Sequence, residues 1–281
     1  MTHDPRVADW RVEVGDLAPY EWRLCQCCGN AYPSHQPHLE VLQRLWAANR
    51  TDTDPAADSS RAWKYRRTIA RAGAMRSYQI FAPLAQSGGR RFIDIACGLG
   101  ETVSIFAANG WDAEGIDADP STAPLHQELG IRARIGQFEY TDIGTGYDMV
   151  HIAHAIYFIT NPMEFIRRVR ERLAPEGLFC IVLADFLANA DAGLPGYAHT
   201  FFPTASSMQY TLALAGFEVV MSKKQSGSIF IAARPAPIPT LPPVWPTTVL
   251  ALYRTKPLRY HLFGRPYLAL RSAFKRLIGR R

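Results

Sequence analysis

The sequence has no long hydrophobic run. No stretch of about 18 uncharged apolar residues occurs in its 281 positions, so no membrane-spanning helix is expected. Asp4, Asp9 and Glu13 make the N-terminal segment unlike a secretory signal peptide. Cysteine is scarce: there are five, and three of them lie together at 25–28, which does not suggest a disulfide framework. These absences predict a cytoplasmic protein.

Acidic residues are missing from the C-terminal segment. Residues 247–281 contain nine Lys or Arg and no Asp or Glu, so the rest of the chain holds 22 bases against 25 acids, and the net charge of +6 comes from the tail. Helical spacing gathers apolar side chains on one face and bases on the other: Tyr267, Leu270, Phe274, Leu277 and Ile278 against Arg271, Lys275 and Arg276. This pattern predicts a basic amphipathic helix.

Two roles remain open for this helix. It could dock on the protein's own surface, or it could make a peripheral contact with a membrane or a partner through residues 247–281, at the inner face of the membrane. Nucleic acid is not expected as a partner, because no stacking aromatic platform accompanies the charge. The oligomeric state is not indicated by the sequence.

Three regions follow one another along the chain. Residues 1–58 form an N-terminal extension with a cysteine cluster, residues 59–234 alternate helix and strand patterns, and residues 235–281 join a Pro-rich linker to the basic tail. Strands are expected near 91–96, 112–117, 131–136, 147–152 and 178–184, with a closing hairpin at 217–221 and 228–233. The fold class is therefore α/β, with a doubly wound, mostly parallel, seven-stranded sheet.

A glycine loop without a third glycine is the most informative motif. Asp94-Ile95-Ala96-Cys97-Gly98-Leu99-Gly100-Glu101 joins an expected strand to an expected helix, and Gly98 and Gly100 let a ligand approach the backbone. The dinucleotide-binding motif has a third glycine at the position of Val103. The loop is also not followed by the lysine of a P-loop. The motif thus argues against a phosphate cradle.

A second carboxylate narrows the ligand. Asp117 ends the next expected strand, 19 residues after Gly98, the separation at which an acid can accept hydrogen bonds from a ribose. A ligand with a ribose and a cationic, non-phosphate end would satisfy both Asp94 and Asp117. S-adenosylmethionine is such a ligand.

The same motifs carry a family resemblance. D-I-A-C-G-L-G-E and G-I-D-A-D-P-S resemble the first two motifs of class I S-adenosylmethionine-dependent methyltransferases. Residues 147–182 are similar to that family's fourth strand, following helix and fifth strand, and residues 198–220 resemble a segment of the bacterial branch that acts on sugars and natural-product intermediates. The resemblance spans roughly residues 85–233 and implies a Rossmann-like methyltransferase fold.

The resemblance implies a set of cofactor-binding residues. Asp94 would approach the methionine ammonium, Asp117 would hold the ribose, and Gln137 and Phe138 would flank the adenine, although the family usually has an acid at the position of Gln137. The full set is Asp94, Ala96, Gly98, Gly100, Asp117, Ala118, Gln137, Phe138 and His151. Ala96 stands where the family has its first glycine, and the alternative for His151 is a structural hydrogen bond beneath the cofactor.

Candidate catalytic residues follow the fourth expected strand. Methyl transfer depends on alignment, and it needs a base only when the nucleophile carries a proton. His154 and His199 match histidines that recur in the branch, whereas Tyr157 and Phe158 replace its usual glutamate and second histidine. The catalytic candidates are therefore His154, His199 and Tyr157, with structural hydrogen bonding as the alternative for the histidines.

The cysteine cluster has the spacing of a zinc knuckle. Cys25-x-x-Cys28-Gly29 supplies two ligands, and His35 and His38 could complete a tetrahedral site. The segment resembles the second of two knuckles in the bacterial branch, but residues 1–24 contain no cysteine for the first. The alternative is a segment that packs without zinc.

These observations predict an enzyme that transfers a methyl group from S-adenosylmethionine to a small molecule, a sugar, or a glycan or lipid-linked intermediate. Two alternatives remain. One is a catalytically degenerate methyltransferase fold that serves as a binding or scaffold protein, and the other is a nucleotide-binding oxidoreductase, against which Val103 argues.

Overall fold

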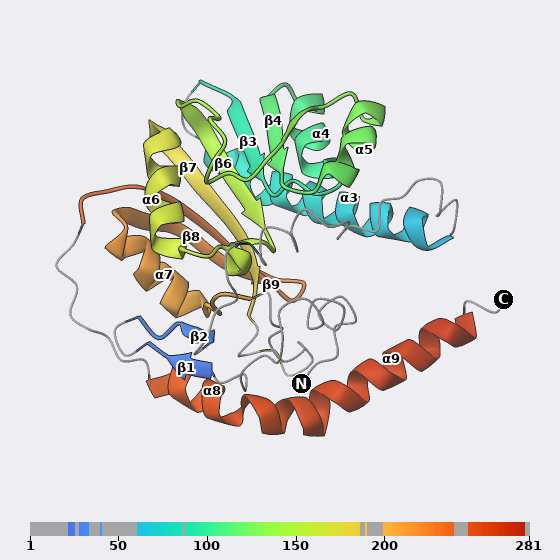
Figure 1. The fold of residues 1–281 in the computed structure, drawn as a ribbon. Helices are drawn as coiled ribbons and strands as arrows, with labels where there is room; N and C mark the ends of the chain where they lie inside the picture. The colour runs from blue at the N-terminus through green and yellow to red at the C-terminus, as the bar shows by residue number, and fades with distance from the viewer. Residues whose placement is uncertain are drawn as a thin grey trace.

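The computed structural model describes residues 22–25, 28–33, 40, 61–85, 88–185, 189, 199–238 and 247–278 (Figure 1). The strands are β1 (Trp22–Leu24), β2 (Ala31–Pro33), β3 (Arg91–Ile95), β4 (Asp112–Asp117), β5 (Arg132–Ile135), β6 (Tyr147–Ala153), β7 (Leu173–Ala184), β8 (Phe217–Gln225) and β9 (Ser228–Pro235). The α-helices are α3 (Arg61–Phe81), α4 (Glu101–Ala108), α5 (Ala123–Glu128), α6 (Pro162–Arg172), α7 (Ala205–Leu214), α8 (Thr247–Arg259) and α9 (Arg265–Ile278). Short turns η1 (Ala82–Leu84), η2 (Pro120–Thr122) and η3 (Ile156–Phe158) are 3₁₀-helical, and η4 (Tyr260–Gly264) is a π-helix.

Seven strands form one sheet in the order β5-β4-β3-β6-β7-β9-β8. The strands from β5 to β7 are parallel to one another, and β9 runs antiparallel to both β7 and β8. This arrangement confirms the expected seven-stranded, mostly parallel sheet. The chain leaves β3 toward β4 and later returns to the other side of β3 with β6. The carboxyl ends of β3 and β6 therefore meet at the switch point where open α/β sheets bind ligands.

Helices cover both faces of the sheet. On one face, Phe81 of α3 and Phe106 of α4 are buried in the same cluster as Phe92 of β3. On the other face, the helices α6 and α7 bury Phe165 and Leu212 against strand residues. The two clusters take alternate residues of each central strand, as the pleat requires. The result is a three-layer sandwich.

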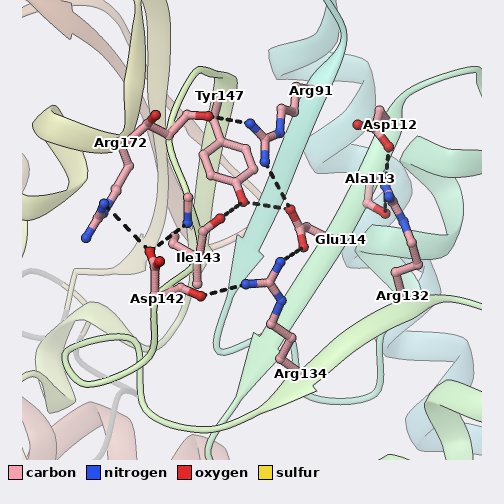
Figure 2. Close-up of polar contacts among 12 residues, drawn as sticks. Arg91, Asp112, Ala113, Glu114, Arg132, Arg134, Asp142, Ile143, Tyr147 and Arg172 are labelled. Carbon is pink, nitrogen blue, oxygen red and sulfur yellow. Dashed lines mark hydrogen bonds and ion pairs between the residues drawn. The ribbon is translucent and has the colours of Figure 1, made fainter.

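A polar cluster closes the amino-terminal end of the sheet (Figure 2). Glu114 of β4 is buried, with Arg134 Nη2 of β5 at 2.8 Å from Oε2 and the Tyr147 hydroxyl of β6 at 2.6 Å from Oε1. Arg91 of β3 lies 3.8 Å from the same carboxylate. Burial, and then the neighbouring Glu114, raise the pKa of the Tyr147 phenol. The cluster joins four strands at the end of the sheet opposite the switch point.

Strand β7 begins earlier than its apolar run suggests. Leu173 pairs with Tyr147, the register then shifts, and Leu178 pairs with Met149. The expected boundary near 178 is correct for the continuous ladder, whereas residue 173 adds a first pair before the irregularity. Pro175 and Gly177 lie between residues 173 and 178 and interrupt the apolar pattern, so the pattern alone does not predict the first pair.

The C-terminal helix begins at Thr247, well before the amphipathic pattern that starts at Tyr267 in the sequence. Pro257 lies inside α8 and reads as a helix breaker in the sequence, because proline lacks the N–H that the helix needs. Side chains of this stretch bond carbonyls of the preceding turn: Arg259 Nη2 donates to the Leu252 carbonyl at 2.9 Å, and Thr255 Oγ1 donates to the Ala251 carbonyl at 2.7 Å. The π-helix η4 then joins α8 to α9 without a break.

Strands β1 and β2 form a separate antiparallel hairpin that contacts the α/β body. The backbones of Ala31 and Phe202 exchange two hydrogen bonds, of 3.2 and 2.6 Å. Asn30 Nδ2 donates to Thr211 Oγ1 of α7 at 2.8 Å. The hairpin is thereby fixed beside the segment that precedes α7.

Candidate active site

The glycine loop leaves β3 in a left-handed conformation. Ala96, Gly98 and Gly100 have φ values of 55°, 52° and 79°. A Cβ at Gly98 would enter open space, so this is the side from which a ligand can reach the backbone. A Cβ at Gly100 would meet the end of the Ile131 side chain, and the φ of 79° strains any residue with a side chain, so glycine is favoured there.

Asp117 holds the loop from the neighbouring strand. Its Oδ2 accepts the Gly98 N–H at 2.7 Å, and its Oδ1 accepts the Asp119 N–H at 2.9 Å. Burial raises the pKa of the Asp117 carboxyl, against these backbone hydrogen bonds, which lower it. An ionised carboxylate has about four acceptor positions, so both oxygens retain the capacity to accept ribose hydroxyls.

His126 of α5 holds the same loop from the other side. Its Nε2 lies 2.8 Å from the Gly98 carbonyl oxygen, to which it donates, and 3.8 Å from Cys97 Sγ. The ring is buried, and among the described residues its Nδ1 has no hydrogen-bond partner. Sequence reasoning missed His126, because only the packing of α5 brings it next to a loop 28 residues earlier.

Asp94 and His151 are direct neighbours across the switch point. They are register partners on β3 and β6, and Asp94 Oδ1 lies 2.6 Å from His151 Nδ1. Since an ionised carboxylate only accepts, Nδ1 carries the hydrogen. His151 Nε2 lies 3.2 Å from Ser77 Oγ of α3, and both His151 and Asp94 are buried. The structure thus places His151 beneath the loop, in contact with Asp94.

The residues expected around the adenine follow β5. The Gly136 N–H donates to the Asp117 carbonyl at 2.8 Å, which places this turn beside Asp117. Gln137 is half-buried, whereas Phe138 lies in the core with its ring 5.1 Å from that of Phe165. Ala118 is half-buried directly after Asp117.

His154 stands at the carboxyl end of β6. Its φ is 53°, its N–H donates to the Val182 carbonyl at 2.8 Å, and its Nε2 lies 3.5 Å from Ser228 Oγ of β9. The side chain reaches solvent, yet partial desolvation, and then the nearby His151, lower the pKa of His154 below its usual value. A lowered pKa favours the neutral imidazole, the form that can accept a proton.

Tyr157 and His199 come together in an aromatic cluster. The His199 ring lies 5.4 Å from that of Tyr157, 4.7 Å from Phe158 and 4.9 Å from Phe202. The Thr200 N–H donates to the Tyr157 carbonyl at 2.9 Å and fixes the two segments to each other. The backbone of Phe202 pairs with Ala31 of the β1–β2 hairpin, so the hairpin lies next to this cluster.

Cys25 and Cys28 close the turn between β1 and β2. The Cys25 N–H donates to the Asn30 carbonyl at 2.8 Å, and the Gly29 N–H donates to the Cys25 carbonyl at 2.9 Å. Burial raises the pKa of the Cys28 thiol to about 11. His35 and His38 lie outside the described residues, and within the described part no group of three or more ligands assembles. Zinc binding here stays a prediction.

Residues 59–222 match the family described as methyltransferase domain. The chain belongs to the class I S-adenosylmethionine-dependent methyltransferases. Its cofactor is S-adenosylmethionine, and membership of this family decides against the oxidoreductase alternative.

Individual relatives of this methyltransferase are distant. It is 28% identical over 151 residues to the ubiquinone biosynthesis O-methyltransferase of Azorhizobium caulinodans, a match that covers 47% of this chain and 60% of that relative. The PH0226 protein of Pyrococcus horikoshii OT3 has a similar fold, with a TM-score of 0.50 and 16% identity over 63% of this chain and 92% of that one. The glycopeptide N-methyltransferase MtfA, solved with S-adenosylmethionine, gives a TM-score of 0.47 and 14% identity over 58% of this chain and 93% of that one.

The loop of this methyltransferase fits the cofactor. The open space at Gly98 admits a ligand, and the half-buried Asp117 carboxylate retains acceptor capacity. When bound, S-adenosylmethionine supplies an electrophilic methyl group on a sulfonium. The roles of the individual loop residues stay predictions.

Proposed function

We propose that this methyltransferase acts on a small molecule, a sugar, or a glycan or lipid-linked intermediate, which binds at the carboxyl ends of β6 and β7. The observation that carries the proposal is His154, whose ring lies beside Ser228 at this edge and whose pKa is lowered. A neutral imidazole at the ligand edge of the sheet suits an acceptor that must lose a proton.

His154 acts as the base in this proposal. Its imidazole takes the proton from an acceptor hydroxyl or amine, while the acceptor heteroatom aligns for an in-line displacement. Phe158 and His199 are half-buried and rest on the buried rings of Tyr157 and Phe202, and together they form an aromatic wall that positions the acceptor and excludes water. Excluding water raises the reactivity of the nucleophile, because its hydration shell is removed.

Two considerations bear on the acceptor. The curated relative is named an O-methyltransferase, which supports oxygen as the atom that receives the methyl group, but the chain spans only 60% of that relative. The resemblance of residues 198–220 supports the branch that acts on sugars and natural-product intermediates. Ala96, Gln137 and the replaced glutamate keep a degenerate, scaffolding methyltransferase as the second candidate.

Two measurements test the proposal. Calorimetric titration with S-adenosylmethionine comes first, because absence of binding would favour the scaffold. Incubation with the cofactor and a panel of hydroxylated sugars, lipid-linked glycans and phenols follows, with mass spectrometry to detect exchange of one hydrogen for a methyl group. Binding accompanied by a methylated product of one class identifies the acceptor, whereas binding without transfer to any class contradicts the proposed acceptor range.

A further inference from the structure

The C-terminal helices expose a row of large apolar side chains. Leu258, Phe263, Tyr267, Leu270 and Phe274 are 60%, 65%, 51%, 71% and 65% exposed, respectively. Figure 1 shows α9, in red, projecting away from the sheet and the helices that cover it. We refer to these five residues as the apolar row.

The π-helix keeps the apolar row on one side. The steps between its members are five, four, three and four residues, and the step of five leads from α8 into η4 (Tyr260–Gly264), where Phe263 lies. A π-helix bonds residue i to i+5 and has more residues per turn than an α-helix, so a longer step keeps a side chain on the same side there. The row is therefore continuous from α8 into α9.

The charge around the apolar row has one sign. Arg254, Arg265 and Arg271 are exposed on the same helices, and residues 247–281 contain nine bases and no acid. A helix that combines an exposed apolar face with an excess of bases complements a surface that is apolar below and anionic above. A bilayer with anionic headgroups has both properties.

We propose that the apolar row docks on the surface of a bilayer that contains anionic phospholipid. The helix lies in the plane of the interface, with the row buried at the boundary between headgroups and acyl chains and the arginines among the headgroups. Among the described helices, none is long and apolar enough to cross a membrane, which agrees with a peripheral contact.

A buried lysine joins this helix to the edge that carries His154. Lys256 Nζ donates to the Asn189 carbonyl at 2.6 Å. Asn189 in turn donates from its backbone to the Asp185 carbonyl at 2.9 Å, just beyond β7, and from Nδ2 to the Gly227 carbonyl at 3.3 Å. Gly227 precedes Ser228, the neighbour of His154. If the proposed function holds, docking brings the acceptor edge to the lipid surface and favours a lipid-linked acceptor.

Vesicle sedimentation tests the docking without reference to methyl transfer. The full-length protein is mixed with sucrose-loaded vesicles of phosphatidylcholine alone, or of phosphatidylcholine with phosphatidylglycerol. We expect the protein to pellet with the anionic vesicles and to do so more weakly at high salt or with neutral vesicles. The variant L270Q/F274Q should lower the partition coefficient about tenfold or more, because it removes two apolar side chains from the row.

A matched variant separates the row from the helix as a whole. A269Q/S272Q also introduces two glutamines, but at exposed positions outside the row, and it should pellet like the unmodified protein. Glutamine is a good helix former, so both variants retain the helix, and calorimetry with S-adenosylmethionine verifies the catalytic domain. Equal pelleting of the two variants overturns the proposal. So does failure to pellet with anionic vesicles, or a change of oligomeric state in L270Q/F274Q that leaves its vesicle binding intact, since this would assign the row to a second copy.

Discussion

Ala96 is the residue at which the loop departs from glycine, and its backbone shows the consequence. Its φ of 55° lies in the left-handed region, which costs an L-residue about 1–2 kcal/mol. Ala96→Gly should therefore raise the free energy of unfolding by about 0.5–1 kcal/mol, after the greater freedom of glycine in the unfolded chain is subtracted. Denaturant unfolding measures this.

Ala107 provides the matched control for that substitution. It is an exposed alanine within α4, so Ala107→Gly should lower the stability by about 1 kcal/mol, as glycine does inside a helix. Equal losses in the two variants would show that Ala96 is not strained.

His154 carries the kinetic prediction at this scale. His154→Asn keeps a residue that tolerates positive φ but removes the base, so kcat should fall by about 100-fold or more while the affinity for S-adenosylmethionine stays the same. Asp117→Asn should instead weaken the binding of S-adenosylmethionine and leave kcat at saturating cofactor unchanged. Calorimetry and steady-state rates measure both, and a loss of cofactor affinity in His154→Asn would show that the histidine is structural.

The lowered pKa of His154 fixes the direction of the pH dependence. The base must be neutral, and a pKa below the usual value of about 6.5 keeps it neutral over a wider range. The rate should therefore be constant near neutral pH and fall only as the pH drops below 6.5. This fall in rate at acid pH should be absent in His154→Asn. A fall that begins above pH 7 would contradict this assignment.

At the scale of elements, the packing of α4 on β4 explains why the missing third glycine is tolerated. A Cβ on Gly115 would lie 2.7 Å from Cys97 Sγ and 3.0 Å from Val103 Cγ2. The chain thus has a valine on the helix and a glycine on the strand, and close packing is retained.

This arrangement predicts a coupling between the two positions. Gly115→Ala should destabilise the fold by about 1–3 kcal/mol through overpacking. The same substitution should cost less when Val103 is also alanine, because the helix side then yields space. A double-mutant cycle of unfolding free energies measures the coupling, and strict additivity would show that the two residues do not share the space.

The sequence predicts individual elements of this fold, but it does not predict the contacts between them. The strand, loop and helix around Gly98 are local patterns, and their positions are predictable from alternation and turn residues. Contacts such as Asp94 with His151, or His126 with Gly98, depend on strand register and helix packing, which no local pattern encodes. Helix α8 was not predicted for another reason: Pro257 signals a break in the sequence, yet the helix runs through it.

At the scale of the molecule, the N-terminal hairpin supports the proposed acceptor side. Asn30 bonds to Thr211, and Ala31 pairs with Phe202 next to His199. Asn30→Ala should lower stability by about 1 kcal/mol and raise the KM for the acceptor, with the affinity for S-adenosylmethionine unchanged.

Tyr32 is the control for this substitution. It is exposed on the same hairpin, so Tyr32→Ala should leave the KM for the acceptor and the affinity for S-adenosylmethionine unchanged. If Asn30→Ala alters cofactor affinity instead of the acceptor KM, the hairpin does not support the acceptor wall.

The two halves of the site differ in how far apart their residues lie along the chain. Asp94, Gly98 and Asp117 belong to one strand–helix–strand unit, whereas the proposed acceptor side joins segments that contain Ala31, His154 and Ser228. Short loops close at little entropic cost, and contacts between distant segments form later. During synthesis the cofactor half can therefore form before the acceptor half is complete. Over evolution, the acceptor half can change its specificity while the cofactor half keeps its affinity.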